Sequence, residues 1–223
     1  MNRELFKQAM VKFFAGLILV ALLLFLPAWT LRYPQAWLLI CILFIPMFAA
    51  GLVMMKKDPD LLRKRLSARE KESEQKTVVA LSGLMFLAAF VFAGLSFRFG
   101  WLMLPFPVSI VFAVVFLLSY AMYAEVLMEN AYLSRTIEVQ EGQKVVDTGL
   151  YGIVRHPMYS ATLILFLSMP LVLGSVISFV ITLAYIPIIV KRIRNEEKVL
   201  GKDLPGYEEY MGKVKYRLVP FIW

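Results

Sequence analysis

The feature that most constrains this chain is a series of uncharged apolar runs, each long enough to cross a membrane. Four runs cover Phe13–Leu31, Tyr33–Met55, Thr77–Phe97 and Phe99–Ala124, and a fifth covers Pro157–Val190. Crossing a hydrocarbon core of about 30 Å takes roughly 17 to 25 helical residues. The 223-residue chain is 60% hydrophobic and 18% charged, whereas soluble domains average about 25% charged residues. We therefore predict an all-α fold, a polytopic bundle of membrane helices.

The fifth run is too long for one membrane crossing. As a single helix it would extend about 50 Å at 1.5 Å per residue, and it would carry the basic tail to the opposite side. A turn at Gly174 and Ser175, with Pro170 weakening the first arm, divides the run into a short hairpin. We expect about six membrane segments, the last two forming this hairpin, or five if the hairpin is only partly immersed. A cytoplasmic amphipathic helix follows the break at Pro205 and Gly206.

The basic residues predict how these segments are oriented. The net charge is +8, yet only Arg32 and Arg98 lie in the two short turns on one side. The other basic residues fall in the amino terminus, in 56–76, in 135–155 and from residue 191 onward. Basic loops remain on the cytoplasmic side, so both termini are expected in the cytoplasm, at a bacterial inner membrane or an ER-like membrane. This placement indicates a lipid bilayer, and no nucleic acid, as the partner.

The amino terminus and the metal-binding residue types narrow the possibilities further. Basic residues precede the first apolar run, as in a secretory signal, but the run is too long for one and is expected to remain as a helix. Cys41 is the only cysteine and His156 the only histidine. An ordinary Cys/His zinc or iron site needs more such ligands, so no metal is expected.

The loop Lys56–Lys76 mixes eight basic and five acidic residues. One interpretation is an interfacial helix with Leu61, Leu62 and Leu66 facing the membrane and basic residues at the headgroups. The other is a solvated charged linker. Neither interpretation gives this loop a catalytic role.

The segment Gly149–Tyr159, GLYGIVRHPMY, is the strongest candidate for chemistry. A residue before proline is disfavoured in the helical region, so His156 is expected at a helix start with Pro157 in the first turn. Free N–H groups there would receive a carboxylate. Glycines at 149 and 152 allow positive φ or close approach of a ligand, although turns explain most such glycines. A plain helix start is the alternative.

The second arm of the hairpin returns charged residues to the same membrane face: Arg192, Arg194, Glu196 and Glu197. Ionisable groups gathered at a membrane edge indicate a functional site, although Glu197 could equally be solvated charge. The chain has no P-loop, Rossmann fingerprint, HExxH motif or nucleophile elbow. The remaining possibility is chemistry in which a bound reagent supplies the reactivity and the protein binds and orients it.

Several motifs occur in order along Asn130–Trp223: Gly149-Leu150-Tyr151, Arg155-His156-Pro157-Met158-Tyr159, Glu196-Glu197, Leu204-Pro205-Gly206-Tyr207 with Tyr210, and Tyr216-Arg217-Leu218-Val219-Pro220. Together they resemble the isoprenylcysteine carboxyl methyltransferases, within a wider set that includes membrane phospholipid methyltransferases. The resemblance implies a methyltransferase that uses S-adenosyl-L-methionine at the cytoplasmic membrane face. It divides the chain into membrane scaffold helices over 1–129, with the charged cytoplasmic loop at 56–76, and a catalytic region over 130–223 made of a cofactor loop, the hairpin and the tail.

The same resemblance implies roles for individual residues. The cofactor-binding positions are Gln140, Gln143, Lys144, Val145, Val146, Tyr151, His156, Pro157, Met158, Tyr159 and Glu196. Gly149 and Gly152 become room for the cofactor. Arg192 corresponds to the arginine that holds the acceptor carboxylate, with Arg194 as its rival, and Glu197 or His156 would act as a base for an amine acceptor.

The expected acceptor is a lipophilic molecule, most simply a prenylcysteine-like carboxylate. N-methylation of a phospholipid or another lipid is the alternative within the same class. From a different class comes a non-enzymatic membrane binding or transport protein. Transport sites favour ionisable residues near the membrane midplane, and the predicted spans contain no Asp, Glu, Lys or Arg.

Overall fold

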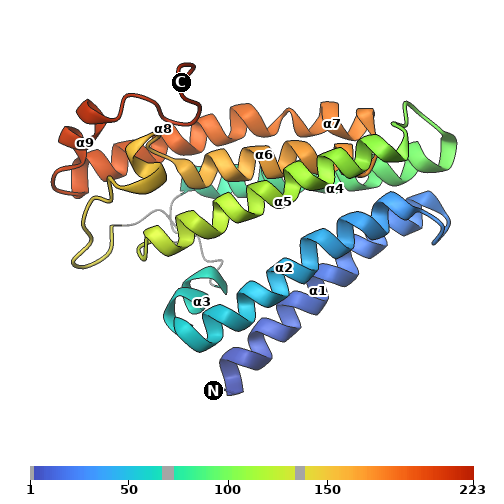
Figure 1. The fold of residues 1–223 in the computed structure, drawn as a ribbon, viewed down its shortest axis with the longest axis horizontal. Coiled ribbons are helices and arrows are strands. Elements are labelled where there is room, and N and C mark those ends of the chain that lie inside the picture. The colour runs from blue at the N-terminus through green and yellow to red at the C-terminus, as the bar shows by residue number, and fades with distance from the viewer. Residues whose placement is uncertain (1–2, 67–72, 134–138) are drawn as a thin grey trace.

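The computed structural model describes residues 3–66, 73–133 and 139–223, and the long elements in these ranges are helices that lie roughly side by side (Figure 1). The first four long helices are α1 (Arg3–Ala28), α2 (Pro34–Lys57), α4 (Ser73–Phe99) and α5 (Phe106–Glu129). Each helix covers most of one uncharged run, and all four extend into charged residues at one or both ends. The runs are helical because chain in hydrocarbon must satisfy its own backbone hydrogen bonds. The predicted all-α membrane bundle is confirmed.

The helices are fastened together at the end of the bundle opposite the charged loops. Tyr33, at the start of α2, is fully buried, and its hydroxyl donates to the Leu173 carbonyl at 2.6 Å. Its ring stacks on Phe97 with centroids 4.1 Å apart. A buried tyrosine needs such a hydrogen-bond partner, so this contact joins α2 and α4 to the later hairpin.

The predicted hairpin in the fifth apolar run is confirmed. Helix α6 (Pro157–Val172) is followed by α7 (Val176–Thr182) and α8 (Tyr185–Asp203). Gly174 has a φ of +73° and closes the turn, and the Ser175 side chain accepts a hydrogen bond from the Ser178 N–H at the start of α7. This turn needs glycine because side chains rarely adopt positive φ.

The helices account for the expected membrane segments. In the described chain, five stretches are long and apolar enough to cross a membrane: α1, α2, the part of α4 from Lys76, α5, and the continuous Val176–Asp203. The apolar α6 is shorter, at 16 residues, as expected for one arm of a short hairpin. The protein is an integral, multi-pass membrane protein.

The charged loop forms a helix that packs against protein. Helix α3 (Pro59–Leu66) is capped by Asp58, whose carboxylate accepts from the Leu61 N–H at 2.9 Å. Leu62 is 4% exposed and packs with Leu5 of α1 and Met55 of α2, and Leu66 lies against the same cluster. The interpretation in which Leu61, Leu62 and Leu66 face the membrane does not hold for Leu62 and Leu66, because they pack against an apolar surface of α1 and α2, and Leu61 is buried as well. Residues 67–72 of the predicted loop lie outside the described residues.

The remaining elements gather at the end of the bundle that carries α9 (Tyr207–Lys213) (Figure 1). They are the loop that follows α5, the 3₁₀ turn η1 (Gly149–Gly152), and the carboxy-terminal segment. The N–H groups of Arg155 and His156 donate to the carbonyls of Tyr216 and Arg217, both at 2.9 Å. The carboxy-terminal segment therefore pairs with the backbone that immediately precedes α6.

Candidate active site

A polar pocket opens where these elements meet. The loop after α5, η1, the start of α6, the second half of α8, and α9 form its walls. The lining residues are Asn130, Tyr132, Leu133, Gln143, Lys144, Val145, Val146, Tyr151, Arg155, His156, Met158, Tyr159, Glu196, Leu200, Leu204, Tyr207 and Tyr210. Hydroxyl, amide and carboxylate groups thus face one concave space, the arrangement typical of a small-molecule site.

Three buried tyrosines shape this pocket. The Tyr151 hydroxyl accepts from the Asn130 amide at 3.0 Å, and the Tyr210 hydroxyl donates to the Tyr151 carbonyl at 2.8 Å. The Tyr207 hydroxyl is buried and has no hydrogen-bond partner among the described residues. Burial, reinforced by the charges of Glu197 and Glu196, raises the pKa of Tyr207. Its hydroxyl therefore keeps its proton at neutral pH and is an available donor.

Tyr159 links the two helices of the hairpin. Its hydroxyl donates to Glu196 at 2.5 Å and accepts from Arg192 Nε at 2.8 Å. Its ring lies against that of His156, with centroids 5.8 Å apart. Glu196 and Arg192 are four residues apart on α8 and so lie on one face of the helix. One phenol therefore connects an acidic group to a basic group.

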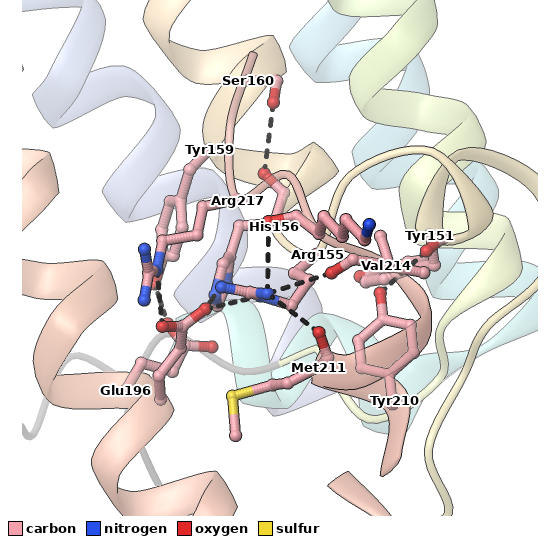
Figure 2. Close-up of polar contacts among 12 residues, drawn as sticks. Tyr151, Arg155, His156, Tyr159, Ser160, Glu196, Tyr210, Met211, Val214 and Arg217 are labelled. Atoms are coloured by element: carbon pink, nitrogen blue, oxygen red, sulfur yellow. Dashed lines mark hydrogen bonds and ion pairs between the residues drawn. The ribbon is translucent and has the colours of Figure 1, made fainter. Parts of the chain in front are cut away.

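Arg155, His156 and Arg217 lie close together in the site (Figure 2). All three contact the carboxylate of Glu197, which is the centre of a largely buried charge cluster. Arg155 and Arg217 each donate to its carboxylate at 2.7 Å, and His156 Nε2 lies 3.3 Å away. Arg155 also donates to the Val214 carbonyl at 2.9 Å. The cluster therefore ties α6, α8 and the carboxy-terminal segment together. The alternative interpretation of Glu197 as solvated charge is wrong, since this residue is 8% exposed.

A second, mostly apolar groove lies beside the polar pocket. It is lined from α4 by Val78, Val79, Ser82, Gly83 and Phe86, from α6 by Met158, Tyr159, Thr162 and Phe166, from α8 by Tyr185, Ile188, Ile189 and Arg192, and by Arg65 and Tyr123. Met158 and Tyr159 line both spaces. A polar site and an apolar site therefore share one wall.

Most of the predicted cofactor residues surround the polar pocket. Nine of the eleven line it: Gln143, Lys144, Val145, Val146, Tyr151, His156, Met158, Tyr159 and Glu196. Gln140 is not among the lining residues, and its side chain donates to the Tyr132 carbonyl at 2.5 Å. Pro157 is fully buried in the first turn of α6. These two residues shape the walls, while the binding roles of all eleven stay predictions.

The three residues predicted to act on the acceptor separate in space. Arg192 lines the groove, while Arg194 is exposed in a different surface depression with Lys191 and Lys198. Glu197 lines neither space and already accepts from three donors. Of these three residues, Arg192 alone lines either of the two spaces, and the roles of all three stay predictions.

The two glycines lie where groups of the chain itself come close. Gly149 has a φ of +53°, and a Cβ on it would lie 3.1 Å from the Glu129 carboxylate. A Cβ on Gly152 would lie 3.2 Å from the Asp147 carbonyl. The positive φ allowed for by the sequence is confirmed at Gly149. Neither glycine lines the polar pocket, and their interpretation as space for a cofactor stays a prediction.

Several residues of the site were not assigned roles from the sequence, among them Tyr207, Tyr210, Arg217 and Arg65. The first three lie in the quoted carboxy-terminal motifs, so their order along the chain was a usable signal. Arg65 was part of a charged loop with no catalytic role expected. Its place in the groove depends on packing between distant segments, which no local pattern reveals.

Comparisons with known proteins bear on the region around the hairpin. The chain is 32% identical over 91 residues to the Delta(14)-sterol reductase TM7SF2 of Mus musculus, covering 40% of this chain and 22% of that protein. The matched part therefore spans about a fifth of that relative. The model of the isoprenylcysteine carboxyl methyltransferase (ICMT) family matches residues 108–202, from α5 through α8. Residues 108–202 thus carry the pattern of the ICMT family, a methyltransferase family, and the resemblance predicted from the motifs is confirmed.

Proposed function

We propose that this protein is a membrane methyltransferase that binds S-adenosyl-L-methionine in the polar pocket and methylates a lipophilic acceptor in the apolar groove. The observation that carries the proposal is the shared wall of these spaces, formed by Met158 and Tyr159. Group transfer between two bound molecules requires their reacting atoms to meet at about 3 to 3.5 Å. A polar and an apolar site that open onto the same two side chains meet this requirement.

The residues of the polar pocket fit the proposed cofactor. Glu196 offers a carboxylate to an ammonium group or to ribose hydroxyls. The Tyr207 hydroxyl, which lacks a partner among the described residues, offers a buried donor. Tyr151 and Tyr159 offer aromatic faces to a sulfonium or an adenine ring. His156 Nε2 already faces Glu197, so the nitrogen left for the methionyl carboxylate is Nδ1, and donation from both nitrogens would require the imidazolium form.

The chemistry divides between the reagent and the chain. S-Adenosyl-L-methionine, when bound, supplies an activated methyl group on a sulfonium. An acceptor carboxylate is already ionised, so the chain needs only to align it and exclude water. Arg192 would hold the carboxylate, and Phe86, Phe166 and Ile189 would receive its apolar part.

An amine acceptor, as in phospholipid N-methylation, would require removal of a proton. Glu197 is poorly placed for that task, because Arg155, Arg217 and His156 already surround it. The described residues that line the groove include no carboxylate. The geometry therefore favours O-methylation of a carboxylate. A transport function is disfavoured because the charged groups of the site gather at one end of the bundle.

The proposal extends to the organisation of the chain. The positive-inside rule would place the polar pocket and both termini in the cytoplasm, where a water-soluble cofactor has direct access. The proposed catalytic region covers 130–223, and residues from the preceding part of the chain contribute to the acceptor site. Helices α3 and α4, within 1–129, contribute walls to the acceptor groove, so the scaffold would also take part in binding.

Calorimetry on the detergent-solubilised protein tests cofactor binding. We expect heat on addition of S-adenosyl-L-methionine or its demethylated product, and affinity about tenfold or more weaker in Glu196→Gln, because a charge-assisted contact contributes about 1.5–3 kcal/mol. Glu209→Gln is the matched control, since Glu209 is exposed on α9. Absence of binding by the unaltered protein would overturn the proposal, and binding of a reduced nicotinamide instead would favour a reductase.

A radiolabelled methyl group tests the acceptor. An ester formed on a carboxylate releases its label as methanol in base, whereas a methylamine retains it. Label that resists base would overturn the proposed O-methylation while leaving methyl transfer itself intact.

A further inference from the structure

Arg65 lies in the last turn of α3, outside the segment that matches the ICMT family, yet it lines the acceptor groove. Its two terminal nitrogens lie 3.9 and 3.8 Å from the sulfur of Met158. Its guanidinium carbon lies 5.7 Å from the centroid of the Tyr123 ring. Arg65 therefore reaches from the charged loop to the wall that the two spaces share.

These contacts give the N–H donors of the Arg65 guanidinium only weak hydrogen-bond acceptors among the described residues. A guanidinium has five N–H donors, and a thioether sulfur is a weak acceptor. Arg65 Nε is buried and has no hydrogen-bond partner among the described residues. Leaving a buried donor without an acceptor is costly, more so when the group is charged. An anionic ligand in the groove would supply the acceptor that this donor lacks.

A neighbour on the same helix shows the contrasting case. Arg63 pairs with Asp60 at 3.0 Å, and its side chain is 54% exposed. Arg65, two residues later, faces inward, and the described lining of the groove offers it no carboxylate. The position of Arg65 is therefore specific to the groove and does not reflect the general charge of the loop.

We propose that Arg65 and Arg192 together bind the anionic headgroup of an amphiphilic acceptor, whose apolar part lies between α4, α6 and α8. The inference rests on the proposed function and adds Arg65 to it as a second residue that binds the acceptor headgroup. Both arginines line the groove, Arg65 against Met158 and Arg192 against Tyr159. They would attract a carboxylate or phosphate and repel an ammonium at the point where the acceptor meets the polar pocket.

The residues that line the groove support an amphiphile over a small anion. They continue from Arg192 along α8 to Tyr185 and from Met158 along α6 to Phe166, and most of those beyond the arginines are apolar. Apolar surface of this kind binds hydrocarbon, with free energy roughly proportional to the area buried. An ionic head and a hydrocarbon tail match the two parts of the groove.

The test compares three probes on the full chain in detergent: an S-prenylated N-acetylcysteine, its methyl ester, and phosphatidylethanolamine. Binding and transfer of radiolabelled methyl are measured for the unaltered protein, Arg65→Ala, Arg65→Lys and the control Arg63→Ala. We expect Arg65→Ala to lower the affinity for the anionic probe that accepts the methyl group by about 10- to 100-fold, the range for a hydrogen bond to a charged group. Arg65→Lys should recover part of the affinity, because a lysine keeps the charge but not the planar fork.

In every variant, affinity for the demethylated cofactor should stay within about twofold of the unaltered protein. The melting temperature should stay within a few degrees. A stronger effect on the prenylcysteine would identify a carboxylate acceptor, and a stronger effect on phosphatidylethanolamine would identify a phosphate-bearing one. Equal affinity for the acid and its methyl ester, with phosphatidylethanolamine unaffected by Arg65→Ala, would overturn the inference. Cofactor binding by the unaltered protein reports separately on the proposed function, so the two failures are distinguishable.

Discussion

Replacing Glu197 by glutamine tests whether this carboxylate holds the carboxy-terminal segment in place. The substitution keeps the shape of the side chain and removes the charge that faces Arg155 and Arg217. The Arg155 side chain is 6% exposed, and removing one partner of a buried ion pair costs about 3–5 kcal/mol. The Arg217 side chain is 35% exposed, so that pair adds little, about 0–1 kcal/mol. Since the glutamine oxygen retains one acceptor, we expect a loss of about 3 kcal/mol.

Hydrogen exchange of the detergent-solubilised protein measures this loss where it should occur. The N–H groups of Arg155 and His156 donate to the carbonyls of Tyr216 and Arg217, and local opening of the segment exposes them. A loss of about 3 kcal/mol corresponds to exchange roughly 100-fold faster. Glu209→Gln should leave exchange unchanged. If exchange in Glu197→Gln is also unchanged while methyl transfer is lost, Glu197 acts on the reacting groups and the positioning role is refuted.

Two further substitutions distinguish residues that bind the cofactor from residues that bind the acceptor. Tyr207→Phe removes a hydroxyl without a partner among the described residues, so we expect unchanged or slightly higher thermal stability and a roughly 2- to 10-fold weaker affinity for S-adenosyl-L-methionine by calorimetry; lower stability with unaltered affinity would contradict this. Arg192→Ala should lower the affinity for the acceptor by about tenfold or more and largely preserve the affinity for the cofactor. Arg194→Ala is the control, because Arg194 is exposed. Collapse of cofactor binding in Arg192→Ala would show that Arg192 supports the polar pocket.

Features that depend on local chain geometry could be predicted from the sequence. The turn at Gly174 and Ser175 follows from a positive-φ requirement and a run too long for one crossing. The start of α6 follows from the His156-Pro157 pair, because proline fixes the first turn and restricts the residue before it. The order of the motifs then placed nine of the predicted cofactor residues around one pocket.

Features that depend on which distant segments meet could not be predicted in the same way. Leu62 has the amphipathic pattern of an interfacial helix, and the packing of α1 beside α2 provides the protein surface that covers it. Glu197 has the sequence surroundings of a solvated charge, but Arg217 and Arg155 reach it from two other segments. Gly149 has the appearance of a ligand-binding glycine, whereas the nearby carboxylate belongs to Glu129.

Tyr159 explains why these separate features combine into one site. Under the proposed function, the two bound molecules present opposite charges to each other, a sulfonium on one side and an anion on the other. Tyr159 places an acid toward the first space and a guanidinium toward the second, because its hydroxyl donates to Glu196 and accepts from Arg192. The electrostatic preference of each space would therefore depend on the position of one ring, which packs on His156 and is fixed by the first turn of α6.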